Sequence, residues 1–164
     1  MVCMNAVMFL CVMLEVKRYN SILQLERHVE ITDYNSLLTV ARMQPQPQLF
    51  LFVFMKKSLP EDHKGDEAYR FNSGLGGELT PVMTLSKSVA ELTGFGDLVQ
   101  ESKQQNREWD LVSVAALSGN QNKLPSDETA LKQLELMMKT VESGGDLSKY
   151  MTFDKQGEPI VFSK

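Results

Sequence analysis

The segment from Leu49 to Met55 reads LFLFVFM and is apolar at every position. In an extended chain, Phe50, Phe52 and Phe54 lie on one side and the residues between them lie on the other. A strand that is apolar on both sides has no face for water, so it belongs in the middle of a sheet whose two faces are covered. This segment therefore predicts a central strand and a layered fold.

Regular patterns on either side of this strand predict the other elements. Thr32 is the expected N-cap of a helix that has Asp33 in its first turn and ends before the QPQPQ run of residues 44–48. Ser88 and Glu91 form a capping-box pattern at the start of a second helix. The further predicted elements are strands at 79–85 and 111–117, helices from 89 to about 105 and from 126 to 142, and a hairpin made by YMTFDK and PIVFS.

The helix predicted at 126–142 carries an apolar stripe, and a pair of glycines follows it. Gly144 and Gly145 are expected to end this helix, because glycine adopts the left-handed conformation that helix C-termini require. The residues of the predicted stripe are Leu131, Leu134, Met138 and Val141.

The alternation of these helices and strands predicts the fold class. Strands that alternate with helices are typical of βαβ units, whose strands run parallel. We therefore expect an α/β fold with a central mixed, mostly parallel sheet of about five strands, covered by helices, with a C-terminal antiparallel hairpin. Residues 32–164 are long enough to form one domain with a single core.

Residues 1–31 are predicted to be an apolar N-terminal tail or extension outside the fold. From Met1 to Leu14 the sequence is apolar except at Asn5, but a membrane-spanning helix takes about 20 residues. A signal peptide would need positive charges before this stretch and small residues after it, and neither is present. A membrane-surface anchor formed by these residues, or a packed helix or strand, remains open.

The supply of reactive side chains limits the chemistry that this chain can perform. Both cysteines, Cys3 and Cys11, lie in the tail, which leaves residues 12–164 without a thiol for redox, nucleophilic or metal chemistry. The histidines are His28 and His63, and the net charge is −4 with no run of basic residues. We therefore expect no cofactor, no metal, no nucleic-acid partner and a cytoplasmic location, with an unknown protein partner and oligomeric state left open.

One loop stands where α/β sheets usually bind ligands. The loop from Ser118 to Ser126 leaves the end of a buried strand and enters a helix, and it offers polar side chains and one lysine. An ordinary polar connection is the alternative. The candidate ligand-binding residues of this loop are Ser118, Gly119, Asn120 and Asn122.

A second group of candidates is Gly76, Gly77 and Glu78, within the run NSGLGGELTP. A phosphate-binding loop follows a strand and opens a helix, whereas these glycines precede a strand, so a flexible turn is the competing interpretation. The acidic loop at residues 60–67 contains His63 but has no established metal-ligand spacing, and a solvated loop is expected there.

Four strings, PQLFLFVF, GGELTPVM, EWDLVSVAALSG and FDKQGEP, resemble a group of short bacterial proteins that are labelled as ribonucleotide reductase subunit alpha. The resemblance extends from about Tyr34 to Phe162 and leaves out the tail. A true reductase large subunit is several times longer and depends on cysteines. Because residues 12–164 contain none, no catalytic role of a reductase can be assigned to this sequence.

These observations favour a cytoplasmic binding or regulatory module over an enzyme. The alternatives are a small enzyme or ligand-binding protein that uses the strand-end loops, and a protein associated with ribonucleotide reductase. A pocket lined by the Ser118 loop together with Asp110, Glu78 or His63 would favour the ligand-binding alternative.

Overall fold

The computed structural model describes residues 30–73 and 76–162 of the chain, so most of the predicted tail lies outside the described residues. The elements in chain order are α2 (Tyr34–Arg42), β1 (Gln48–Ser58), α3 (Gly65–Asn72), β2 (Glu78–Ser88), the 3₁₀ turn η1 (Val89–Glu91), α4 (Phe95–Gln104), β3 (Leu111–Ser118), α5 (Asp127–Glu142), the 3₁₀ turn η2 (Leu147–Lys149), β4 (Met151–Asp154) and β5 (Pro159–Ile160).

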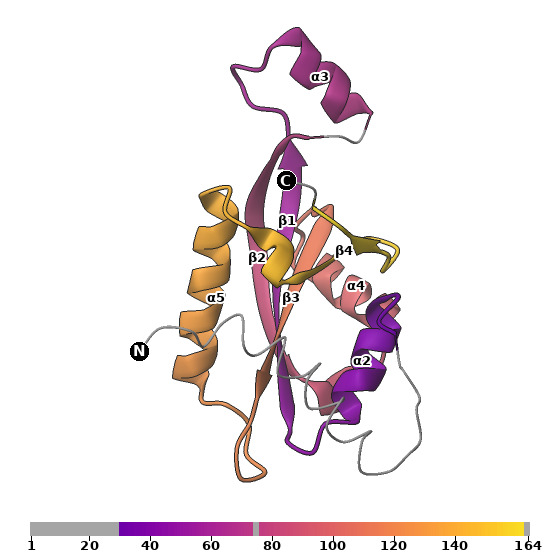
Figure 1. The fold of residues 1–164 in the computed structure, drawn as a ribbon, viewed down its shortest axis with the longest axis vertical. Coiled ribbons are helices and arrows are strands. Elements are labelled where there is room, and N and C mark those ends of the chain that lie inside the picture. Colours follow the sequence, from indigo (N-terminus) through magenta and orange to yellow (C-terminus); the bar gives the residue numbers. More distant parts are fainter. Residues whose placement is uncertain (1–29, 74–75, 163–164) are drawn as a thin grey trace.

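Three layers build the body of the protein (Figure 1). The sheet lies in the middle, α5 covers one face, and α2 and α4 cover the other. Phe50, Phe52 and Phe54 point into the first core, under α2 and α4, and the alternate residues of β1 point into the second core, under α5. All the residues from 50 to 55 have no exposed surface. The predicted central strand, buried on both sides, is therefore confirmed.

The sheet has the strand order β2-β1-β3-β4-β5, and every neighbouring pair is antiparallel. The prediction of a mixed, mostly parallel sheet is wrong, although the α/β class is right. β2 and β3 run in the same direction and are joined by α4, as in a βαβ unit, but β1 lies between them and runs opposite to both. The alternation of helices and strands indicated the crossover from β2 to β3. It carried no information on whether another strand would lie between the two in the sheet.

Two predicted helix starts are corrected or refined by the structure. The N-cap of α2 is Asp33 rather than Thr32, because the Asp33 carboxylate accepts the Ser36 N–H at 2.7 Å and satisfies a free donor of the first turn. The capping box at Ser88 is present, but it opens only η1. Gly94 then interrupts the helix, and α4 begins at Phe95.

The apolar stripe of α5 is rotated relative to the prediction. Leu131 is 61% exposed, whereas Met137 is fully buried, so the prediction of Leu131 as a core residue is wrong. Both stripes have helical spacing, and only the contact with the sheet selects between them. The residues of α5 that pack on the second core are Ala130, Leu134, Met137 and Val141, with Met138 partly buried beside them.

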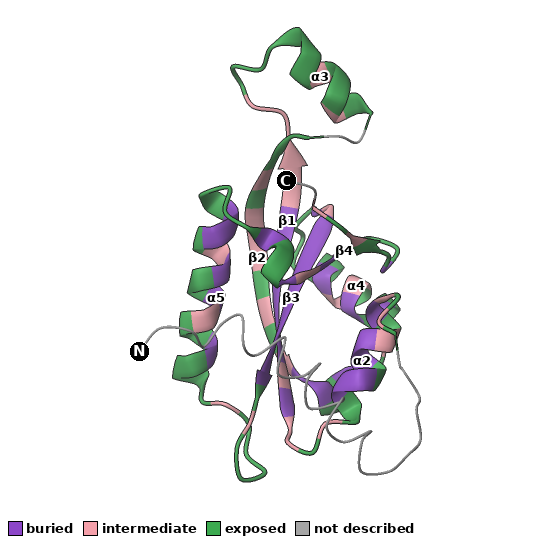
Figure 2. Cartoon of the chain, viewed as in Figure 1, coloured by how far each residue is buried: buried purple, intermediate pink, exposed green. Residues whose placement is uncertain are grey.

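Beyond the body, the ends of β1 and β2 carry an arm, which we define as residues 59–73. The arm contains α3 and projects from one end of the sheet (Figure 1). No residue of α3 is buried, and Tyr69 is 75% exposed, so the arm is almost entirely in contact with water (Figure 2). This short helix has no core of its own, and its structure depends on its junction with the sheet and on the hydrogen bond that the Lys64 N–H donates to the Glu67 carboxylate at 2.9 Å.

Candidate functional site

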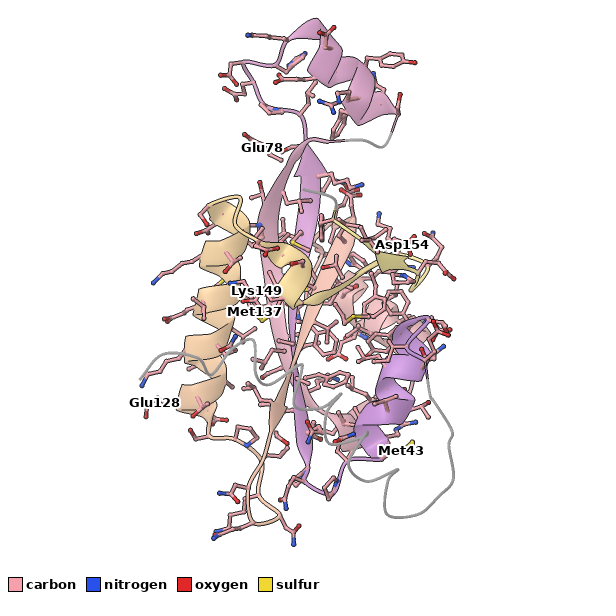
Figure 3. All side chains as sticks on the ribbon, viewed as in Figure 1. Met43, Glu78, Glu128, Met137, Lys149 and Asp154 are labelled. Atoms are coloured by element: carbon pink, nitrogen blue, oxygen red, sulfur yellow. The ribbon has the colours of Figure 1, made fainter. Side chains whose placement is uncertain are left out.

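A cleft with a volume of about 1020 Å³ lies at the root of the arm, on the face of the sheet that α5 covers. Three segments distant in sequence supply most of its lining: the start of β2, the C-terminal end of α5 with its following turn, and residues 160–162. Lys57 of β1 and Leu111 of β3 complete it. Figure 3 shows Glu78 at this end of the molecule, where β2 meets the arm. Ligand pockets for small molecules usually measure about 300–1,000 Å³, so this cleft has room for a sizeable ligand.

The floor of the cleft is the open end of the second hydrophobic core. Leu111, Val141 and Leu147 are buried members of that core, and they also line the cleft. Leu79, Ile160 and Phe162 pack against the same core and are only partly buried. Val161 is 90% exposed at the edge. The cleft therefore offers apolar surface whose burial would favour binding.

The rim of the cleft is acidic. Its ionisable side chains are Lys57 against Glu78, Glu142 and Asp146, which gives a formal net charge of −2. Glu78 and Glu142 are exposed and form no ion pair with any described residue. Asp146 accepts the Ser148 N–H at 2.9 Å and so caps η2.

The end of α5 adds to this negative potential. The Gly145 N–H bonds the Thr140 carbonyl at 2.8 Å and the Gly144 N–H bonds the Val141 carbonyl at 3.0 Å, which together form a Schellman cap with Gly144 at φ +62°. The prediction that these glycines end the helix is confirmed. The partial negative charge of a helix C-terminus lies at this end of α5, next to Glu142.

Asp110 fixes the strands behind the cleft. Its carboxylate accepts the Lys57 N–H at 2.9 Å and lies 3.4 Å from the Lys56 ammonium and 3.7 Å from that of Lys155. Partial burial of Asp110 acts to raise its pKa, but the hydrogen bond and the two ammonium groups outweigh this effect, and the pKa lies below its ordinary value. This cluster links β1 and β3 to the turn between β4 and β5.

Gly77 forms the junction between the arm and the cleft. Its φ is +102°, and a Cβ there would lie 2.7 Å from Phe71 Cδ2 and 3.0 Å from the Ser58 carbonyl oxygen. Glycine is needed at this position both for its backbone conformation and for the close approach of Phe71. The prediction of a flexible turn at the glycines understated this role, because the contact with α3 is not visible in the sequence.

The two predicted groups of ligand-binding residues lie at opposite ends of the sheet. Glu78 pairs with Ser58 at one end of β1 and Ser118 pairs with Gln48 at the other. At a rise of about 3.3 Å per residue, these positions are roughly 33 Å apart. Gly76, Gly77 and Glu78 line the cleft, whereas the residues of the Ser118 loop do not.

Around Ser118 the polar groups form hydrogen bonds with one another, with the segment before β1 and with the first residue of β1. Ser118 Oγ accepts a hydrogen bond from Gln48 at 2.7 Å, and Asn120 and Lys123 exchange backbone hydrogen bonds at 3.0 and 2.9 Å. The Asn122 N–H donates to the Gln46 side chain at 3.1 Å. Gly119 is required by packing, since a Cβ would lie 2.0 Å from the Lys123 carbonyl oxygen. Ligand binding by these residues stays a prediction.

His63 belongs to the exposed arm, where its Nδ1 lies 2.9 Å from the Pro60 carbonyl oxygen. Within residues 30–73 and 76–162, no group of three or more His, Cys, Asp or Glu side chains could hold a metal ion. Across the same residues, no helix is long and apolar enough to cross a membrane.

Sequence reasoning did not identify most of the residues that form the cleft. Glu142, Leu147 and Phe162 come from a helix end, a turn and the C-terminal segment, and each has an ordinary local context. The one available signal was the position of Glu142 and Asp146 around the glycine pair, where a chain reversal brings two carboxylates close to a helix C-terminus.

Comparison with known proteins gives no match for this chain, whether among protein-family models, curated proteins or solved structures.

Proposed function

We propose that this protein is a binding module whose partner occupies the cleft at the root of the arm. The observation that carries the proposal is that the apolar floor of the cleft continues into the second core. Apolar surface gathered in a concave site favours the binding of a complementary apolar group.

The lining of the cleft favours binding over catalysis. Among the described residues that line it there is no histidine or cysteine, its hydroxyl side chains are those of Thr80 and Ser143, and its one amine is that of Lys57. A nucleophilic hydroxyl needs a base within hydrogen-bond reach. The described side chains of the cleft thus supply shape, apolar surface and negative charge.

Titration of the uniformly ¹⁵N-labelled full chain with three short peptide sets, acidic, neutral and basic, tests the proposal. Gly76, Gly77, Gly144 and Gly145 line the cleft, and Gly119 at the far end of the sheet is the internal control. We expect at least one set to shift the amide signals of the cleft glycines and to leave Gly119 unchanged. If none of the sets shifts the cleft glycines, the proposal is wrong.

Two variants test whether the peptide binds at the cleft. Val161→Ser removes apolar surface from the exposed edge of the cleft without adding charge, and Leu124→Ser makes a similar change at an exposed apolar residue outside it. Val161→Ser should weaken binding of the active peptide set, and Leu124→Ser should not.

A further inference from the structure

We infer that the partner is a cationic amphipathic peptide segment, in which lysine or arginine residues alternate with apolar ones; this inference rests on the proposed function. The apolar floor selects for apolar side chains, and the acidic rim selects for positive charge. The two features lie on one site, so a ligand that satisfies both must carry both kinds of group.

The charge preference is supported by three elements that surround the cleft. The rim carries a net charge of −2, and the C-terminus of α5 adds partial negative charge beside Glu142. The neighbouring arm has four carboxylates, at Glu61, Asp62, Asp66 and Glu67, against the cations of Lys64 and Arg70, which is again a net of −2. An approaching ligand therefore meets negative potential from the body and from the arm.

The same charges argue against other occupants. A second copy that docks through the same face would bring one acidic surface against another, in a protein whose net charge is −4. Nucleic acid is repelled for the same reason. A peptide of several residues, by contrast, fits the volume of the cleft.

The peptide is expected to bind through its side chains rather than as an added strand of the sheet. β2 is an edge strand, but Pro81 has no N–H to donate, and the register of β2 on β1 shifts between Phe54 and Met55. Prolines and bulges at sheet edges hinder the addition of another strand. We therefore expect the cleft to recognise the peptide by its charge and its apolar side chains, and not by backbone hydrogen bonds to β2.

The test uses a fluorescein-labelled eight-residue peptide that alternates lysine and leucine, measured by fluorescence anisotropy against the full chain. One comparison peptide replaces lysine with glutamate, and a second replaces leucine with serine. The lysine–leucine peptide should bind most tightly, and its affinity should fall as salt is raised. Equal or tighter binding of the glutamate–leucine peptide overturns the inference.

Charge-reversal variants test whether the acidic side chains of the rim are the ones that attract the peptide. The double variant Glu78→Lys/Glu142→Lys should weaken binding of the lysine–leucine peptide by about ten-fold. The control Glu135→Lys/Glu158→Lys makes the same change in net charge at exposed positions outside the cleft and should weaken binding less than about two-fold. Equal weakening by both variants means that the peptide senses only overall charge, and the inference is wrong.

The outcomes separate this inference from the proposed function. Shifts of the cleft glycines by acidic or neutral peptides alone overturn the cationic partner and leave the binding module intact. Concentration-dependent shifts of the same glycines without peptide identify a second copy as the occupant, which also overturns the inference. If no peptide shifts them, the proposed function itself fails.

Discussion

The ring of Phe71 lies so close to Gly77 that a Cβ at Gly77 would come within 2.7 Å of it. This contact joins α3 to the first residues of β2, and Gly77 at the same time lines the cleft. The position of the arm and the shape of the cleft therefore depend on one glycine. Because α3 buries none of its residues, this junction is a main constraint on the arm.

Gly77→Ala should loosen the arm. The variant combines a backbone strain of about 1–3 kcal/mol at positive φ with a clash against Phe71. Hydrogen exchange should show reduced protection of the α3 amides. Gly65→Ala is the control, since a Cβ there meets nothing within 4 Å, and it should not reduce α3 protection, because alanine favours the helix more than glycine does. Undiminished α3 protection in Gly77→Ala would show that the junction does not hold the arm.

Met137→Ala should destabilise the protein by about 2–5 kcal/mol, because Met137 is fully buried against the sheet (Figure 3). Leu131→Ala, on the same helix, should change the free energy of unfolding by less than about 0.5 kcal/mol, since Leu131 is 61% exposed. Urea unfolding followed by the emission of Trp109 compares the two variants. A larger loss for Leu131→Ala would show that α5 faces the sheet with its other stripe.

Asp110→Asn should lower the free energy of unfolding at neutral pH by about 1 kcal/mol or less, because the carboxylate is partly exposed and its interactions with Lys56 and Lys155 are partly screened. The folded-state pKa of Asp110 is lowered, so its stabilising contribution is present above the unfolded pKa of about 3.9 and is lost as the pH falls through the folded value.

Urea unfolding of the wild type and of Asp110→Asn should therefore differ at about pH 7 and converge toward about pH 2.5. Asp62→Asn is the control, since Asp62 is exposed on the arm. A gap between wild type and Asp110→Asn that widens in acid would contradict the assignment.

Two buried hydroxyl groups, one on β3 and one on β4, are expected to contribute to stability as a pair. Ser113 Oγ and Thr152 Oγ1 lie 2.7 Å apart, and both residues are buried. Thr152→Val should cost about 1–3 kcal/mol, because it leaves the Ser113 hydroxyl without this partner. In the double variant Ser113→Ala/Thr152→Val, the loss should be smaller than the sum of the two single losses, as a double-mutant cycle in urea would show. Strict additivity would mean that the hydroxyls do not interact.

Local patterns determined the elements of this fold. The central strand was predicted from its unbroken apolar run, which has no face for water. The capping box at Ser88, the Schellman cap at Gly144 and the C-terminal hairpin follow from residue type and spacing, because each is stabilised by groups close together in the chain. The helix at 126–142 was predicted for the same reason, and the structure places its N-cap at Ser126.

The tertiary structure alone decided the direction of the strands, the face that α5 buries and the site. The pattern of apolar residues indicates which side chains are buried, but it does not indicate which strand lies next to them. The position of β1 between β2 and β3 therefore could not be predicted from the sequence around β1. Glu78, Glu142 and Phe162 became neighbours only when the sheet, α5 and the C-terminal segment packed together. A site assembled from long-range contacts depends on that packing, and no spacing in the sequence encodes it.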